Sequence, residues 1–140
     1  AVCFDKLVVC VLVNSEKDGG LFAPDERVEL IQRVVGRLPN VEVDRSSGLL
    51  SDYCRRRKAC VVVKGLRAVS DYEKEVQMAL INRKLNPRLE TMFLPSSAKY
   101  TYLSSSVVKE MAFYGADLSD FVPREIIDDV NEKMKNRRDG

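Results

Sequence analysis

The 140 residues contain no histidine and no tryptophan. Without imidazole they cannot form a Ser-His-Asp or Cys-His catalytic triad, or a zinc site that needs histidine. The longest apolar run, Leu7 to Val13, is far shorter than the roughly 20 residues that cross a bilayer. No signal-peptide pattern opens the sequence, because Asp5 and Lys6 interrupt its first apolar stretch. We therefore expect a soluble protein with no membrane partner.

Positive and negative charges nearly balance, because the sequence has 23 Lys and Arg and 21 Asp and Glu, which gives a formal net charge of +2. Such a balance creates no long-range field that would attract nucleic acid. The densest basic run, Arg55 to Lys58, closes a predicted helix, where cations interact favourably with the helix dipole. We interpret this run as a solvated helix end and expect no nucleic-acid partner.

The four cysteines, Cys3, Cys10, Cys54 and Cys60, are not spaced as Cys-x-x-Cys. Neither a zinc knuckle nor a thioredoxin-type redox pair is indicated, and the residues suggest no metal ligands of the protein's own. Reduced thiols are typical of the cytosol, which predicts a cytoplasmic protein.

Apolar runs typical of strands alternate with helical patterns along the chain. Strands are predicted over 6–13, 41–43, 59–63 and 90–94, the first and third buried on both faces, and helices over 23–38, 49–57, 70–85, 104–114 and 123–135. This alternation predicts an α/β fold: a Rossmann-like, doubly wound parallel sheet with helices on both faces, plus a C-terminal helix. With no linker or repeat visible, we expect residues 1–140 to form a single domain.

In an open parallel sheet, ligands bind at the carboxyl ends of the strands, beside helix N-termini. The rule selects four segments: 14–20 with Lys17, 47–50, 64–67 and 100–106. Lys64 and Arg67 flank a glycine directly after a predicted buried strand, which suits phosphate oxygens but also fits two solvated cations beside a turn. The serines at 104–106 start a helix, so they suit either an anion site or an ordinary N-cap.

The long predicted helix is expected to begin at Ser70, with Glu73 at capping-box spacing. It carries two apolar stripes, the first made by Tyr72, Val76, Ala79 and Leu80 and the second by Met78, Ile81 and Leu85. Two stripes suggest one face on the sheet and another against a partner subunit, which predicts a homo-oligomer.

In combination, the motifs resemble the bacterial phosphopantetheine adenylyltransferase family. The resemblance covers nearly the whole chain in order and is strongest in Gly65-Leu66-Arg67-Ala68 together with Ser104-Ser105-Ser106. Other matching stretches are 21–22, 25–30, 38–43, 69–73, 77–83, 107–110 and 121–123.

The resemblance implies transfer of an adenylyl group from ATP to 4′-phosphopantetheine, giving dephospho-coenzyme A and pyrophosphate. It implies Lys17 and Arg67 as catalytic residues, Mg²⁺ accompanying ATP, and assembly as a homohexamer. By matched position, the residues that bind phosphopantetheine are Lys17, Leu50 and Lys64. Those that bind ATP are Gly65, Leu66, Arg67, Glu75, Tyr100, Thr101, Tyr102, Leu103, Ser104, Ser105 and Ser106.

The sequence departs from the family pattern in two respects. Its members begin with a strand and a histidine-bearing phosphate loop, neither of which occurs in these residues, and they usually carry arginine where Lys64 stands. Lysine keeps the charge but loses bidentate geometry. In a sheet ordered 3-2-1-4-5 the first strand is central, so we expect the N-terminal strand and loop to be missing from this sequence rather than from the protein.

Two other functions remain open from the residues. One is a different nucleotidylyltransferase, such as a nicotinamide mononucleotide adenylyltransferase, and the other is a catalytically silent nucleotide-binding assembly module. At the residue level, Arg67 has a second interpretation, in which it pairs with Asp71 or Glu75 and only braces the turn.

Overall fold

The computed structural model describes residues 1–13 and 20–138. It divides into two compact units: the first unit comprises Ala1–Ser47 and Leu103–Gly140, and the second unit comprises Gly48–Tyr102. Each unit contains one pair of parallel strands and the helices that pack beside it.

In the first unit, strand β1 (Leu7–Val13) pairs in parallel with β2 (Val41–Ser47), in a register that runs from Leu7↔Val41 to Val13↔Ser47. Helix α1 (Pro24–Val35) connects them. Proline at its first position and Asp25 and Glu26 in its first turn favour a helix start here, because the ring presets φ and the acids suit the positive end of the dipole.

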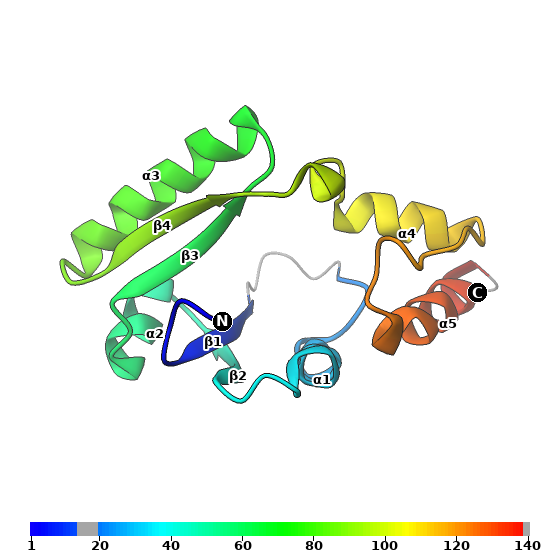
Figure 1. The fold of residues 1–140 in the computed structure, drawn as a ribbon, viewed down its shortest axis with the longest axis horizontal. Coiled ribbons are helices and arrows are strands. Elements are labelled where there is room, and N and C mark those ends of the chain that lie inside the picture. Colours follow the sequence, from blue (N-terminus) through cyan, green and yellow to red (C-terminus); the bar gives the residue numbers. More distant parts are fainter. Residues whose placement is uncertain (14–19, 139–140) are drawn as a thin grey trace. The chain divides into compact units, whose positions relative to one another are not determined.

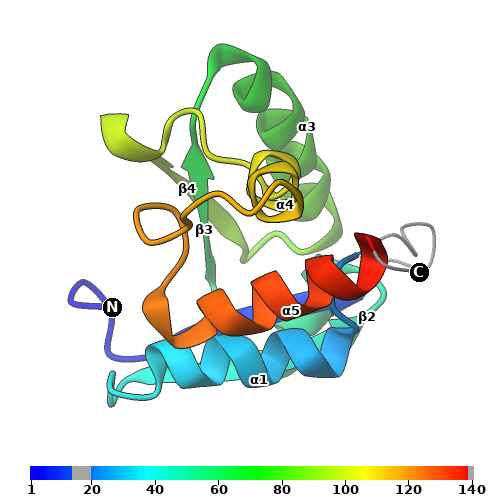
Figure 2. The same ribbon diagram turned by 90° about the vertical axis from the view of Figure 1, so that its right-hand side faces the viewer.

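The first unit continues with helix α4 (Ser105–Phe113), the short 3₁₀ turn η2 (Arg124–Ile126) and helix α5 (Ile127–Arg138). Helices α1 and α5 lie side by side (Figure 2), and two ion pairs join them, Arg33–Asp129 and Lys133–Glu26, both at 2.5 Å. The buried core of this unit consists of Ala112, Leu118, Val122, Val130 and Met134.

The second unit contains helix α2 (Leu50–Arg57), strand β3 (Val61–Leu66), helix α3 (Val69–Leu85), strand β4 (Glu90–Pro95) and the 3₁₀ turn η1 (Ala98–Tyr100). Strands β3 and β4 are parallel, from Val61↔Glu90 to Leu66↔Pro95. Helix α3 runs beside this pair (Figure 1) and is the connection between its strands. Among the described residues of the second unit, the buried hydrophobic ones are Tyr53, Cys54 and Leu89.

The predicted α/β class, with parallel strands that alternate with helices, is confirmed. Among the described residues the strands pair as β1–β2 and β3–β4, the pairs expected on either side of a central strand. A strand that joins them, and a single domain over 1–140, stay predictions. No helix in the described part of the chain is long and apolar enough to span a membrane.

Two details of the strand prediction are wrong. The described strands are not buried on both faces: Val11 is the buried residue of β1, and Val63 in β3 is 36% exposed. Among the described residues, each strand pairs with one other strand. Strand β3 also extends beyond the predicted 59–63, and β2 reaches Ser47 instead of ending at 43, because each ladder continues through polar residues.

Candidate functional site

The segment Lys64–Arg67 lies at the carboxyl end of β3, but it does not follow the strand as predicted. Lys64, Gly65 and Leu66 belong to β3, and Arg67 is the first residue beyond it. Hydrogen bonding to β4 explains the longer strand, since the N–H of Ser96 still donates to the carbonyl of Leu66 at 2.8 Å. A Cβ on Gly65 would lie 3.9 Å from Ser96 Oγ, an ordinary contact. Packing within the second unit therefore does not require glycine here.

Lys64 is paired with an acid of α3. Its Nζ lies 3.2 Å from Oε2 of Glu75, and both side chains are about one-third exposed. This carboxylate oxygen is itself buried and accepts no well-aligned hydrogen bond from the described residues, so the ammonium neutralises it through proximity. The pair brings a residue expected to contact phosphopantetheine next to one expected to contact ATP.

Arg67 is paired with Asp71, in the first turn of α3. Oδ2 of Asp71 accepts from Nε of Arg67 at 3.2 Å and from the Arg67 backbone N–H at 3.3 Å. The side-chain bond from Arg67 holds the pKa of the Asp71 carboxyl below its usual range, and backbone N–H groups act in the same direction against desolvation. Asp71 therefore stays ionised at neutral pH.

This arrangement changes the predicted start of α3. The N-cap is Ala68, so Ser70 lies inside the helix and does not cap it. Asp71 occupies the third helical position, from which an acid can reach back to the chain before the helix. The sequence suggested Asp71 as one of two acids that pair with Arg67, and the structure selects it.

The remaining predicted contacts of the second unit lie on α2 and around η1. Leu50 is the first residue of α2 and is half-buried. Tyr100 and Tyr102 are 45% and 61% exposed, and Lys99 Nζ lies 5.6 Å from the centre of the Tyr100 ring. The hydroxyl of Thr101 donates to the Ser97 carbonyl at 3.5 Å. Exposed tyrosine rings next to a cation offer stacking surfaces of the kind that a purine can use.

The serine segment belongs to the first unit, with Leu103 just before it. Ser104 is the N-cap of α4, and its Oγ accepts from the Val107 backbone N–H at 3.2 Å. The N-cap interpretation therefore holds for Ser104. Ser105 and Ser106 are the exposed first residues of the helix, where backbone N–H groups lack intrahelical acceptors. Lys17 lies outside the described residues.

The structure thus brings Lys64, Gly65, Leu66, Arg67 and Glu75 together where β3 meets α3. Lys64 and Arg67, each paired with a carboxylate of α3, place two sets of N–H donors at the end of the strand. Such an end suits the phosphates of a nucleotide or of a phosphorylated substrate. Within 1–13 and 20–138, no group of three or more Asp, Glu, Cys or His side chains could hold a metal ion.

A family model described as cytidylyltransferase-like matches residues 1–111. The match and the parallel α/β architecture define a nucleotidyltransferase. Among curated relatives, the phosphopantetheine adenylyltransferase of Clostridium botulinum (strain Hall) is 52% identical over 138 residues, which are 99% of this chain and 83% of the relative. That of Clostridium tetani is 52% identical over 134 residues, 96% of this chain and 83% of the relative. The chain belongs to the phosphopantetheine adenylyltransferase family.

Proposed function

We propose that this protein transfers an adenylyl group from ATP to 4′-phosphopantetheine, giving dephospho-coenzyme A and pyrophosphate. The single structural observation that carries the proposal is the end of β3, where Lys64 and Arg67 stand on either side of a glycine. Identity of 52% to phosphopantetheine adenylyltransferases over nearly the whole chain supports the choice of substrates.

The reaction is a displacement at phosphorus. A phosphate oxygen of phosphopantetheine attacks the α-phosphorus of ATP, a new P–O–P bridge forms, and the bond to the β-phosphate oxygen breaks to release pyrophosphate. No covalent enzyme intermediate is required, so the chain contributes by positioning two anionic substrates and by compensating their charge. We assign Lys17 and Arg67 to the reacting phosphates, and Lys17, Leu50 and Lys64 to phosphopantetheine.

We assign ATP to Gly65, Leu66, Arg67 and Glu75 and to the stretch 100–106. The fork of Arg67 can bind phosphate oxygens in a bidentate manner, and backbone N–H groups at the N-terminus of α4 suit an anion, so we assign both segments to ATP. In the structure each of these cations is paired with one acid, Lys64 with Glu75 and Arg67 through its Nε with Asp71, and both cations carry further N–H donors that can bind substrate phosphates.

Mg²⁺ is expected to accompany ATP. The two carboxylates at the end of β3 are each occupied by a cation, so they offer no ready ligand set for the metal. Magnesium is commonly held by substrate phosphates and water, where it neutralises phosphate charge. The residues present fit that mode of binding.

We further propose a cytoplasmic homohexamer. Within the described residues, no disulfide bond is formed by Cys3, Cys10, Cys54 or Cys60, as is typical of proteins in reducing compartments. Helix α3 exposes Met78, Leu80, Ile81 and Leu85, a set of large apolar side chains that a second subunit could cover.

Turnover with ATP and 4′-phosphopantetheine tests the proposal. We expect equimolar pyrophosphate and dephospho-coenzyme A, measured by coupled pyrophosphate detection and mass spectrometry. Formation of a dinucleotide from nicotinamide mononucleotide instead would assign another nucleotidylyltransferase activity. ATP binding without turnover on either acceptor would indicate a silent nucleotide-binding module.

A further inference from the structure

We propose that Asp71 is a positioning residue for the nucleotide: its carboxylate holds Nε of Arg67, so that the other guanidinium nitrogens meet the phosphates of ATP in a set orientation. The inference rests on the proposed function, which assigns Arg67 to ATP. It adds a residue that does not itself contact the substrate and acts through another side chain.

The contacts of Asp71 fit this role. Oδ2 accepts from both Nε and the backbone N–H of Arg67, at 3.2 and 3.3 Å, so one oxygen restrains the residue at both ends. A guanidinium has five N–H donors, of which Nε carries one and the two Nη nitrogens carry four. A carboxylate bound at Nε does not use the planar Nη fork, whose geometry suits bidentate phosphate binding.

The placement of Asp71 favours a charged and fixed carboxylate. It lies in the first turn of α3, where the helix dipole stabilises negative charge. Its side chain is 29% exposed, against 41% for Arg67, so the acid is the more enclosed partner and the arginine the more accessible one. A reduced number of Arg67 conformers before ATP arrives lowers the entropy lost on binding.

Helix α3 repeats the arrangement one turn later, where Glu75 holds Lys64. The two acids are four residues apart and thus lie on one face of the helix. Each acid pairs with one cation. Removal of the Asp71 charge should therefore weaken binding of the ligand of Arg67 and leave binding of the ligand of Lys64 unchanged. A merely structural acid would not produce such a selective effect.

The variant Asp71→Asn tests this, because asparagine keeps the size and an acceptor oxygen for the Arg67 N–H but loses the charge. We expect the KM and the dissociation constant for ATP to rise by about tenfold, the loss of one charge-assisted contact. The KM for phosphopantetheine should stay within about twofold, because Lys64 keeps its own partner. Glu73→Gln is the matched control: it removes an exposed acid from the same turn and should leave both constants unchanged.

A double-mutant cycle separates positioning from a general effect on the helix. Asp71→Asn should add no further loss of ATP affinity in an Arg67→Ala background, because the residue through which it acts is gone. An effect of equal size in both backgrounds, or one no larger than that of Glu73→Gln, would overturn the inference. Thermal melts identify any variant that does not fold, and Asp71→Ser, which keeps a capping oxygen, then takes the place of asparagine.

Failure of the proposed function gives a different result. If the wild-type protein binds ATP but forms no dephospho-coenzyme A, the proposed reaction is wrong. The double-mutant cycle of Asp71 and Arg67, measured as dissociation constants for ATP, still tests the role of Asp71. If Arg67→Ala leaves ATP affinity unchanged, both the ATP role of Arg67 and the positioning role of Asp71 are refuted.

Discussion

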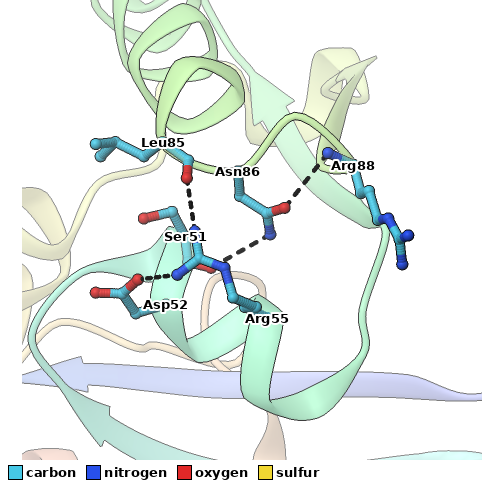
Figure 3. A network of polar contacts seen from close by, with 6 residues as sticks. All are labelled: Ser51, Asp52, Arg55, Leu85, Asn86 and Arg88. Atoms are coloured by element: carbon cyan, nitrogen blue, oxygen red, sulfur yellow. Dashed lines mark hydrogen bonds and ion pairs between the residues drawn. The ribbon is translucent and has the colours of Figure 1, made fainter.

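Ser51 is fully buried in the first turn of α2, and its hydroxyl has no hydrogen-bond partner among the described residues. Its surroundings are otherwise well bonded (Figure 3). Asn86 donates to the Ser51 carbonyl at 3.4 Å and accepts from the Arg88 N–H at 3.3 Å. Arg55 links the carboxylate of Asp52 to the carbonyl of Leu85, at 2.5 and 2.6 Å. This network ties α2 to the end of α3.

We predict that Ser51→Ala leaves the free energy of unfolding unchanged or raises it by up to about 1 kcal/mol, since burial of an unbonded hydroxyl is unfavourable and alanine is a better helix former. Urea denaturation measures the difference. Asn86→Ala, which removes a bonded and buried amide, should lower stability by roughly 1–3 kcal/mol. A loss above about 1 kcal/mol for Ser51→Ala would mean that the hydroxyl is bonded in solution.

Lys64 gives a second prediction, on substrate selectivity. Lys64→Ala should raise the KM for phosphopantetheine by about 10- to 100-fold, the range of a lost charge-assisted contact, with a much smaller effect on the KM for ATP. Lys64→Arg should lower the KM for phosphopantetheine, because a guanidinium can bind phosphate through two parallel hydrogen bonds. Steady-state kinetics with each substrate varied in turn measures both constants. A change in the KM for ATP alone would contradict the assignment of Lys64 to phosphopantetheine.

At the scale of elements, α1 and α5 are joined through Glu26. Its carboxylate accepts from Nζ of Lys133 at 2.5 Å and from the Ala23 N–H at 2.6 Å. The bond from Lys133 is the main cause that holds the pKa of Glu26 below its ordinary value, and the bond from the Ala23 backbone adds to it. Lys133 also lies 5.7 Å from the centre of the Phe22 ring. One acid thus serves as a helix cap and as a contact between helices.

The lowered pKa of Glu26 sets the sign of a pH effect. A carboxyl whose pKa is lower in the folded state stabilises the fold above its ordinary pKa, and the contribution is lost as the pH falls through the folded value. Glu26→Gln should therefore lower Tm at pH 7, whereas below the folded pKa the variant and the wild type should melt alike. Calorimetry between pH 7 and pH 3 measures this, with the exposed Glu29→Gln as control. A Tm difference that is the same at every pH would refute the charge contribution.

The boundaries of several elements followed from local pattern. Pro24 with two acids predicts the start of α1, and Gly115, at φ +73, ends α4 where the sequence placed a stop. The end of β3 was mispredicted because Lys64 and Gly65 have low strand propensity. Backbone pairing with β4 overrides that propensity, and a partner strand 29 residues away is invisible to a local pattern.

At the scale of the whole molecule, α3 has more apolar surface than its own unit covers. Leu80 is 64% exposed, and Met78 and Ile81 are each 50% exposed. The two apolar stripes were readable from helical spacing, but their exposure was not. Only the tertiary structure shows which residues of the two stripes are covered by other residues of the chain.

We predict that this surface mediates assembly. Light scattering coupled to size-exclusion chromatography should give six times the subunit mass that intact mass spectrometry measures. Leu80→Glu should shift the protein to smaller species with little loss of monomer stability, because the side chain is largely exposed. Lys74→Glu, a change of exposed charge on the same helix, should leave the mass unchanged. A wild-type mass equal to that of one subunit would contradict the prediction.

The sequence by itself determined the order and type of the elements, the parallel α/β class, and the positions of the cations and serines that match the family. These properties depend on residues that are neighbours along the chain, so periodicity and motif spacing reveal them. The tertiary structure decided the partners: Asp71 for Arg67, Glu75 for Lys64, and Val107 for the hydroxyl of Ser104. Partner choice depends on where a strand ends and where the next helix begins, and the β3–β4 ladder and the Ala68 cap set both.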